Sequence, residues 1–322
     1  MKILVTGGAG FIGSHLVHAL LAASHEVTVL DDLSSGSLRN LNEAAWLADP
    51  VWKLKFIEGD ICKCAACQRG CDGADVVFHE AAYVSAPGSL SNPRRAYSVN
   101  VEGFINMLLA AREYGVRRFI YASSSAVYGD GHELPKREDM AEFGLGRERI
   151  KLLSPYAASK AANEILAAAA DCPELRCIGL RYFNVFGPKQ NPKGAYAAVI
   201  PRWISAMSGG SQAVIYGDGS ASRDFCYVDD VVAANLAAME TENEAAWGRV
   251  FNVASGTETT LNELFAVLAR LMGREDAQAV HEPPREGDIA RSVASVDAAR
   301  DVLGWTAKVS LEEGLRRMVS VP

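Results

Sequence analysis

Residues 2–13 read KILVTGGAGFIG, an apolar run typical of a β-strand that passes into a glycine-rich turn and then into a helical pattern. Glycines permit a tight turn and let backbone N–H groups approach a pyrophosphate, and the N-terminus of the helix adds partial positive charge. This stretch therefore predicts a dinucleotide site at the end of a first strand. Its predicted cofactor-binding residues are Gly7, Gly10, Phe11, Ile12 and Gly13.

Further apolar runs follow the first one, with amphipathic helical patterns between them. They lie at residues 26–30, 55–59, 75–79, 118–123 and 176–182. Alternating strands and helices imply right-handed crossovers and a doubly wound parallel sheet, so the predicted fold class is Rossmann α/β.

The pattern becomes patchier after about residue 185, where short strands are predicted near residues 213–218 and 249–255. Ligands of doubly wound sheets bind outside the carboxyl ends of the strands, where a second, smaller domain can close over them. We expect residues 1–185 to bind the cofactor and carry the catalytic groups. Residues 186–322 are expected to form mainly a smaller α/β substrate-binding domain, partly interleaved with the first.

The composition is that of an ordinary folded protein. Of 322 residues, 49% are apolar and 22% are charged, and 32 Lys and Arg against 39 Asp and Glu give a formal net charge of −7. Without a basic block, nucleic acid is not expected as a partner. No apolar run approaches the roughly 20 residues that span a bilayer, and the opening lacks the features of a signal peptide. We expect no membrane association and a cytoplasmic location.

Acidic residues at two predicted strand ends refine the cofactor. Asp31 ends the second predicted strand, at about the distance from the glycines at which a carboxylate accepts the adenosine ribose hydroxyls. It would repel a 2′-phosphate, so NAD is expected rather than NADP. Asp60 and Ile61, after the third predicted strand, are placed to meet the adenine.

Tyr156 and Lys160 lie four residues apart on a predicted helix, so both side chains share one face. A nearby ammonium and a positively charged nicotinamide are expected to lower the pKa of the Tyr156 phenol toward neutrality, which would make it a base. A hydroxyl of the serine triplet Ser123 to Ser125, at the end of a predicted strand, can bridge the phenol and a substrate hydroxyl. Tyr156 and Lys160 are therefore predicted catalytic residues.

Together these residues resemble the extended short-chain dehydrogenase/reductase family over essentially the whole chain. Several blocks are similar to nucleotide-sugar 4-epimerases, most closely the UDP-N-acetylglucosamine 4-epimerases. These blocks are RYFNVFGPKQ at 181–190, GAYAAVIPRW at 194–203, SRDFCYVDD at 222–230 and PREGD at 284–288. The resemblance implies NAD-dependent 4-epimerisation of a UDP-hexose through a 4-keto sugar, with hydride passing to and from bound NAD.

The resemblance also implies roles for individual residues, and Ser124 is implied as the third catalytic residue. Beyond those named above, the implied NAD site includes Ala81, Ala82, Asn100, Ser123 and Tyr182. The implied UDP-sugar site comprises Ser85, Ser124, Ser125, Tyr156, Asn184, Gln190, Ala198, Val199, Tyr216, Arg223, Arg285, Asp288 and Ser292. Arg223 and Arg285 would bind the diphosphate, Tyr216 would stack on uracil and Asp288 would meet the ribose.

Ser292 bears on the choice of sugar. It falls where glucose-restricted relatives carry a bulky aromatic, and its small side chain leaves room for a 2-acetamido group without excluding glucose. UDP-N-acetylglucosamine is therefore the expected substrate, with UDP-glucose or a UDP-uronate as alternatives. A 4,6-dehydratase also needs an acid beside Ser124, and the neighbours in sequence are Ser123, Ser125 and Ala126.

Four of seven cysteines lie between Cys62 and Cys71. Such a cluster could bind zinc or an iron–sulfur centre, but Cys64, Cys67 and Cys71 recur at helical spacing, which favours packing against the sheet, and we expect no metal. The family commonly dimerises through the helix starting near Phe104 and the helix carrying Tyr156, so a homodimer is expected.

Overall fold

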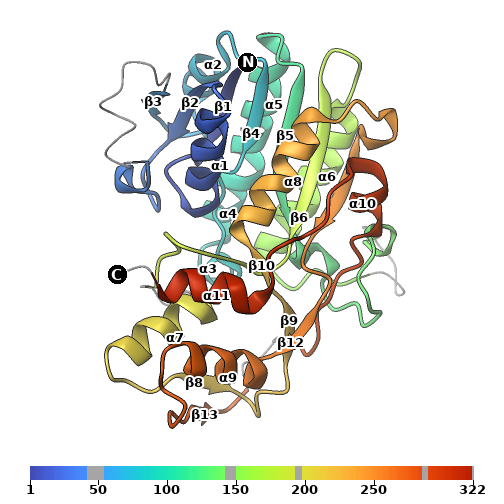
Figure 1. Cartoon of the computed structure of the whole chain (residues 1–322). Helices are drawn as coiled ribbons and strands as arrows, with labels where there is room; N and C mark the ends of the chain where they lie inside the picture. Colours follow the sequence, from blue (N-terminus) through green and yellow to red (C-terminus); the bar gives the residue numbers. More distant parts are fainter. Residues whose placement is uncertain (42–53, 142–149, 193–197, 285–288, 321–322) are drawn as a thin grey trace.

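The computed structural model describes residues 1–41, 54–141, 150–192, 198–284 and 289–320. A seven-stranded sheet lies at its centre, and every neighbouring pair of strands is parallel (Figure 1). Across the sheet the strands follow the order β11 (Arg249–Val253), β6 (Arg176–Tyr182), β5 (Arg118–Ser124), β4 (Val76–His79), β1 (Lys2–Thr6), β2 (Glu26–Asp31) and β3 (Leu54–Glu58). The predicted doubly wound Rossmann fold is confirmed.

The strand order reverses beside β1, because the chain runs outward from β1 to β3 and then returns to β4 on the other side. The crevice outside the carboxyl ends of β1 and β4 is therefore the topological switch point, where open α/β sheets bind ligands. Six strands lie where apolar runs predicted them. The seventh, β11, pairs with β6 and so joins the large sheet although it comes from the C-terminal part of the chain.

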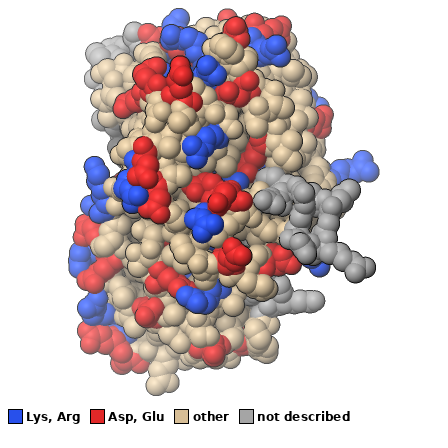
Figure 2. All heavy atoms as spheres, turned by 90° about the vertical axis from the view of Figure 1, so that its right-hand side faces the viewer, with Lys and Arg blue, Asp and Glu red and all other residues tan. Residues whose placement is uncertain are grey.

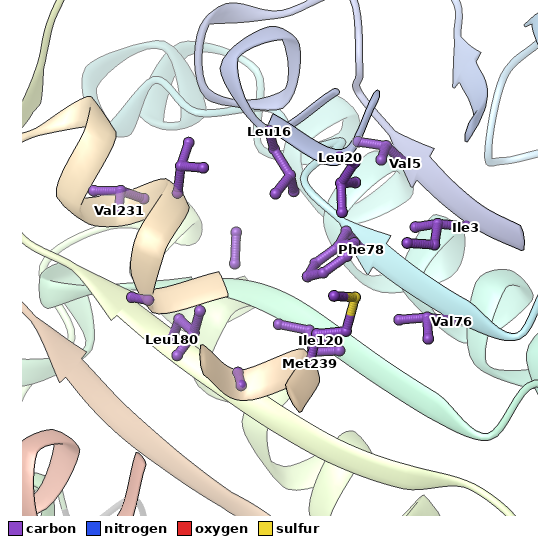
Figure 3. Packing of buried hydrophobic residues seen from close by; sticks show 14 of the residues in the cluster. Ile3, Val5, Leu16, Leu20, Val76, Phe78, Ile120, Leu180, Val231 and Met239 are labelled. Atoms are coloured by element: carbon purple, nitrogen blue, oxygen red, sulfur yellow. The ribbon is translucent and has the colours of Figure 1, made fainter. Parts of the chain in front are cut away.

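Helices cover both faces of the sheet. One face carries α1 (Phe11–Ala22), α8 (Val228–Glu240) and α10 (Asp297–Leu303), and the other carries α2 (Cys64–Cys71), α5 (Gly103–Glu113) and α6 (Pro155–Ala170). Figure 3 shows the first of these cores, in which Leu16 and Leu20 of α1 point toward Phe78 of β4. The helices of both halves of the chain thus bury the apolar faces of one sheet.

A separate apolar cluster holds most of the C-terminal elements together, in the lower part of Figure 1. It packs α7 (Val199–Ser208), α9 (Leu261–Leu271) and α11 (Leu311–Val319) around Trp203 and Phe186, which are almost fully buried. The small sheets there pair β7 (Val185–Phe186) with β10 (Cys226–Tyr227), β8 (Val214–Tyr216) with β13 (Val280–Glu282), and β9 (Ser222–Asp224) with β12 (Glu258–Thr260).

Short helical segments complete the described chain. They are η1 (Leu38–Asn40), α3 (Ala86–Ser91), α4 (Pro93–Tyr97), the π-helical turn η2 (Ser98–Glu102), η3 (Ser125–Tyr128), η4 (Glu138–Met140) and η5 (Glu244–Ala246). Among the described residues no helix has both the length and the apolar character needed to cross a membrane. On the face shown in Figure 2, acidic and basic side chains are interspersed.

The cysteines of α2 do not all pack against the sheet. Cys67 and Cys71 are buried in the core below β1 and β2, but Cys64 is exposed and its thiol donates to Asn106 of α5. The expectation for Cys64 was wrong because it occupies the first turn of a short helix, at its open edge. Within the described residues, no group of three or more His, Cys, Asp and Glu is arranged to hold a metal ion.

Candidate active site

The glycine turn closes tightly between β1 and α1. Gly7 adopts a φ of +68°, and a Cβ added there would lie 2.7 Å from the backbone nitrogen of Ala81. A Cβ added at Gly13 would overlap the carbonyl oxygen of Gly7. Only glycine fits at these two places, so the backbone at the N-terminus of α1 is open to a close-approaching anion. This cradle fits the pyrophosphate of a dinucleotide.

The loops after β1 and β4 meet at the switch point. The Thr6 hydroxyl accepts from the backbone N–H of Ala81 at 3.2 Å and also lies 3.0 Å from Nδ1 of His79. Ala81 therefore lies beside the glycine turn, and Ala82 follows it in the chain. Their place in the cofactor site stays a prediction.

Asp31 ends β2 and holds the glycine turn in place. Its two carboxylate oxygens accept from the backbone N–H groups of Ala9, at 2.9 Å, and Leu33, at 2.8 Å. Burial raises the pKa of this carboxyl, while the two backbone bonds lower it. Each oxygen retains a second lone pair, so Asp31 can still accept from a ribose hydroxyl.

Asp60 and Ile61 follow β3 at the same edge of the sheet. Asp60 accepts from the backbone N–H of Cys62 at 2.8 Å, and Ile61 is buried against the start of α5. The carboxylate and the apolar side chain are therefore adjacent at a strand end, as an adenine ring would require.

Helix α6 brings Tyr156 and Lys160 to the end of β5. Ser154 caps the helix, since its hydroxyl accepts from the N–H of Ala157 at 3.1 Å. The Ser124 side chain acts on the Tyr156 phenol, whose pKa it lowers, and the Lys160 ammonium donates to the carbonyl of Ala122 at 2.7 Å. The three predicted catalytic residues are thus brought together at the end of β5.

Asn100 fixes the catalytic helix from the side. In η2, its amide donates to Ser159 Oγ of α6 at 2.9 Å and to the carbonyl of Tyr83 at 3.1 Å, and accepts from the N–H of Tyr83 at 2.7 Å. Asn163 of α6 donates to the Asn100 carbonyl at 2.6 Å. Asn100 therefore ties α6 to the loop at Tyr83, and its predicted part in the NAD site stays a prediction.

In the chain by itself, the pKa of the Tyr156 phenol is raised above its ordinary value and not lowered. Burial raises it, the hydrogen bond from Ser124 lowers it, and Glu80 raises it. The expected lowering by Lys160 and the nicotinamide concerns the enzyme with NAD bound and stays a prediction; in the chain alone the Lys160 ammonium donates to the Ala122 carbonyl. Burial also lowers the pKa of Lys160 to about 8, against the charges of Glu80 and Glu164.

Ser123 lies one residue before the catalytic serine but points elsewhere. Its hydroxyl donates to Glu164 of α6 at 2.5 Å, and Glu164 is paired with Arg181 of β6. Sequence reasoning assigned Ser123 to the cofactor and missed this pair. A Glu and an Arg within otherwise apolar helix and strand patterns, NEILAAAA and RCIGLRY, were the available signal.

Glu80 is a second residue that the sequence analysis missed. It directly precedes Ala81, and its carboxylate accepts from the hydroxyl of Tyr182 at 2.7 Å. Tyr182 also accepts from Asn235 of α8 at 2.8 Å. The available signal was a carboxylate in FHEAA, directly after an apolar strand and before two alanines.

On the substrate side, Asp224 gathers three of the predicted residues. Asn184, in the left-handed region at a φ of +27°, donates to the carbonyl of Asp224 at 2.9 Å. Arg223 precedes Asp224 on β9, and Asp224 Oδ2 accepts from the N–H of Ala294, two residues beyond the buried Ser292. These residues, the Asp224 unit, are neighbours through Asp224, which directly follows Arg223 on β9 and accepts from Asn184 and from the segment that carries Ser292.

The other predicted substrate residues are more scattered. Ser85 caps α3 by accepting from Gly88 N–H at 2.9 Å, and Gln190 donates to the carbonyl of Val185 at 3.1 Å. Ser125 begins η3, Ala198 and Val199 begin α7, and Tyr216 ends β8. Arg285 and Asp288 lie outside the described residues.

Comparison with known proteins agrees with this geometry. Residues 3–254 match the sequence model described as NAD dependent epimerase/dehydratase family. A UDP-glucose 4-epimerase of Mycolicibacterium smegmatis is 39% identical, with 99% of this chain and 97% of the relative covered.

Solved structures of similar proteins agree as well. The UDP-N-acetylglucosamine 4-epimerase of Methanobrevibacter ruminantium, in complex with UDP-N-acetylmuramic acid, superposes with a TM-score of 0.88 at 37% identity, covering 99% of this chain and 96% of the other. The UDP-glucose 4-epimerase of Thermotoga maritima, with UDP-glucose, has the same TM-score and identity and coverages of 99% and 97%. The chain therefore belongs to the NAD dependent epimerase/dehydratase family, and it is an NAD-dependent epimerase.

Proposed function

We propose that this enzyme interconverts the C4 epimers of a UDP-hexose, with UDP-N-acetylglucosamine and UDP-N-acetylgalactosamine as its main pair. The observation that carries the proposal is the convergence of Ser124, Tyr156 and Lys160 at the end of β5, where the Ser124 side chain lowers the pKa of the Tyr156 phenol and the Lys160 ammonium donates to the carbonyl of Ala122 at 2.7 Å. A substrate hydroxyl placed beside the Ser124 and Tyr156 side chains can form a hydrogen bond with each of them.

The residues provide proton chemistry at the sugar 4-hydroxyl. Tyr156 removes the proton, Ser124 bridges the phenol and the substrate oxygen, and Lys160 stabilises the phenolate and holds the nicotinamide ribose. NAD, when bound, supplies the hydride acceptor and later the hydride donor for C4. Tyr156 returns the proton once the 4-keto sugar has turned its other face, so the protein ends each cycle unchanged.

The unit around Asp224 supports a nucleoside diphosphate as the other half of the substrate. Arg223 supplies a cation for the diphosphate and Asn184 a neighbouring amide, and Tyr216 offers a flat surface for uracil. Arg285 and Asp288 would add a second cation and a ribose acceptor. We further propose that residues 186–322 act mainly as the UDP-sugar-binding part, while α8, α10 and β11 complete the cofactor domain.

The preference for an acetamido sugar rests on Ser292. Its side chain is small and buried, and Ala294, two residues further on, donates its N–H to Asp224. A small residue leaves room for the acetamido group, and glucose remains a second substrate because unfilled space discriminates weakly. UDP-glucose or UDP-uronate epimerisation is the alternative main activity.

A 4,6-dehydratase is disfavoured by the surroundings of Ser124. Glu164 lies beside this strand end, and its oxygens accept from Ser123 and, at 2.9 and 2.8 Å, from Arg181. A buried carboxylate committed to a guanidinium is a poor general acid. Ser125 and Ala126, which follow Ser124 in the chain, carry no carboxylate.

We also propose a homodimer through α5 and α6, which lie side by side. Leu109 of α5 is 62% exposed and Ile165 of α6 is 56% exposed, although both are large and apolar. A second copy would bury them. Analytical ultracentrifugation should find a dimer, and an obligate monomer would contradict this arrangement.

The test of function uses the protein as purified, without added NAD. It is incubated separately with UDP-N-acetylglucosamine, UDP-glucose and UDP-glucuronate, and proton NMR follows axial and equatorial H4. We expect the acetamido sugar to be converted at a kcat/KM comparable to or above that of UDP-glucose, and no conversion by Tyr156→Phe. Conversion of UDP-glucose or the uronate alone would overturn the sugar assignment, and no conversion of any would overturn the proposed function.

A pair of variants tests the pocket argument. Ser292→Tyr should lower kcat/KM for the acetamido sugar by roughly 10-fold or more relative to UDP-glucose, since steric exclusion acts on the larger group. Ser292→Ala keeps the space and should preserve the ratio of the two substrates. Equal loss for both sugars in Ser292→Tyr would contradict the assignment.

A further inference from the structure

Glu80 is held firmly at the mouth of the cofactor crevice. Its backbone N–H donates to the carbonyl of Thr6 at 3.2 Å, and its carboxylate accepts from Tyr182 at 2.7 Å. Asn235 of α8 donates to the same Tyr182 hydroxyl at 2.8 Å and to the carbonyl of Val231 at 2.9 Å. Two strands and a helix therefore fix the carboxylate, which is not free to swing into solvent.

The charged and titratable groups around Glu80 come from every element packed against it. From α6 these are Lys160 and Tyr156, and from β6 it is Tyr182. His79, beside it on β4, remains neutral because burial lowers its pKa to about 3, and α8 contributes the uncharged Asn235. The Lys160 ammonium donates to the carbonyl of Ala122 at 2.7 Å, and Ala122 follows Tyr121, the residue of β5 that pairs with His79 of β4. Lys160 and Glu80 therefore lie at the same ends of two neighbouring strands, and Lys160 is the cation whose charge acts on the carboxylate.

Lys160 needs such a counter-charge. Burial lowers its pKa to about 8, and Glu80 is the first of the two charges that raise it, ahead of Glu164. Glu164 is already neutralised by the guanidinium of Arg181, which it pairs at 2.8 Å. The oxidised nicotinamide ring carries a positive charge and would favour proton loss from Lys160 further.

We propose that Glu80 is a positioning residue for the epimerase reaction, whose carboxylate keeps the Lys160 ammonium charged beside Tyr156; this deepens, and rests on, the proposed function. The hydrogen bond from Tyr182 matters because it orients the carboxylate and favours its ionised form.

The sign of the pH dependence follows from the same contacts. Burial raises the pKa of Glu80 to about 7, against the Tyr182 hydrogen bond and Lys160. Glu80 is therefore ionised mainly above neutrality, which is where Lys160 begins to lose its proton. Its negative charge raises the pKa of both Lys160 and Tyr156. Removing the charge should shift the activity profile to lower pH, most strongly on its alkaline side.

The decisive variant is Glu80→Gln, which keeps an acceptor for Tyr182 and removes the charge. In the NAD-loaded enzyme labelled with ε-¹³C lysine, NMR follows the protonation of Lys160, and its signal is assigned by its absence from Lys160→Met. We expect the Lys160 midpoint to fall in Glu80→Gln and to be unchanged in the control Glu113→Gln, whose carboxylate is exposed on α5. An unchanged midpoint in Glu80→Gln would overturn the proposal.

A second variant guards against misfolding of the first. Tyr182→Phe leaves the carboxylate but removes the hydroxyl that favours its ionised form, so a smaller shift in the same direction is expected. A shift to higher pH would overturn the proposal.

Kinetics complete the test. With a UDP-sugar that the wild type converts, kcat of Glu80→Gln should match the wild type near pH 6 and fall below it at pH 9, by roughly 10-fold for a one-unit shift of the Lys160 pKa. A loss that is the same at both pH values would indicate a structural defect and overturn the proposal. The NMR titration needs no sugar, so it decides the role of Glu80 even if the proposed substrates are not converted.

Discussion

Replacing Arg181 with methionine should destabilise the protein by about 3–5 kcal/mol, the usual cost of leaving one partner of a buried ion pair uncompensated. Arg181 Nε and Nη2 donate to the two oxygens of Glu164 at 2.9 and 2.8 Å, and the side chains are 3% and 6% exposed. The guanidinium also donates to the Tyr128 hydroxyl at 2.8 Å and to the carbonyl of Glu138 at 3.0 Å. Denaturant unfolding followed by tryptophan fluorescence measures the change.

A double-variant cycle isolates the reason for the loss. Arg181→Met combined with Glu164→Leu removes the stranded charge, so it should regain much of the stability lost in Arg181→Met. Arg291 provides a matched control. It forms the same bidentate pair with Glu258, with Nε and Nη2 2.7 and 2.6 Å from the two carboxylate oxygens, but its side chain is 63% exposed. Arg291→Met should leave the unfolding midpoint almost unchanged. A double variant no more stable than Arg181→Met, or an equal effect at Arg291, would refute the reasoning.

Two further predictions concern the cofactor turn and acid stability. Gly13→Ala should purify with much less bound NAD than the wild type, because the added Cβ would overlap the Gly7 carbonyl; the NAD is measured after release with acid. Gly209→Ala, at the end of α7, is the control. A normal NAD content in Gly13→Ala would contradict the role of the glycine turn. Burial lowers the pKa of His79 from 6.5 to about 3, so between these pH values His79 is protonated in the unfolded chain but neutral in the native protein. The free energy of unfolding should therefore fall as the pH drops below about 6.5, by at most ~1.4 kcal/mol per pH unit. His79→Gln should weaken that dependence, and an identical slope in denaturant unfolding between pH 4 and 7 would contradict it.

Local patterns predicted the elements of the cofactor half well. The run at residues 176–182 became β6 with the same bounds, and the glycine turn opens α1 directly after β1. The meeting of Ser124, Tyr156 and Lys160 was also predictable, because helical spacing places two of them on one face and the end of a parallel strand presents the third.

Partners far apart in the chain were less predictable. The strand at 249–253 was expected in the C-terminal part, yet it extends the large sheet beyond β6, since an apolar run does not specify which strand edge it will pair with. Cys64 shared the spacing of Cys67 and Cys71 but lies in solvent, because a helix of one or two turns buries only part of any stripe.

The sequence by itself determined the class of the protein. Strand and helix periodicity indicated the Rossmann fold, the glycines and Asp31 predicted where a dinucleotide binds, and Tyr156 with Lys160 predicted a catalytic helix, because each of these depends on short-range spacing along the backbone. Only the tertiary structure decided how charge is distributed in the site. It joined Glu80 to Tyr182 and Glu164 to both Ser123 and Arg181, because burial and long-range contact, which no local pattern encodes, determine which carboxylate faces which partner.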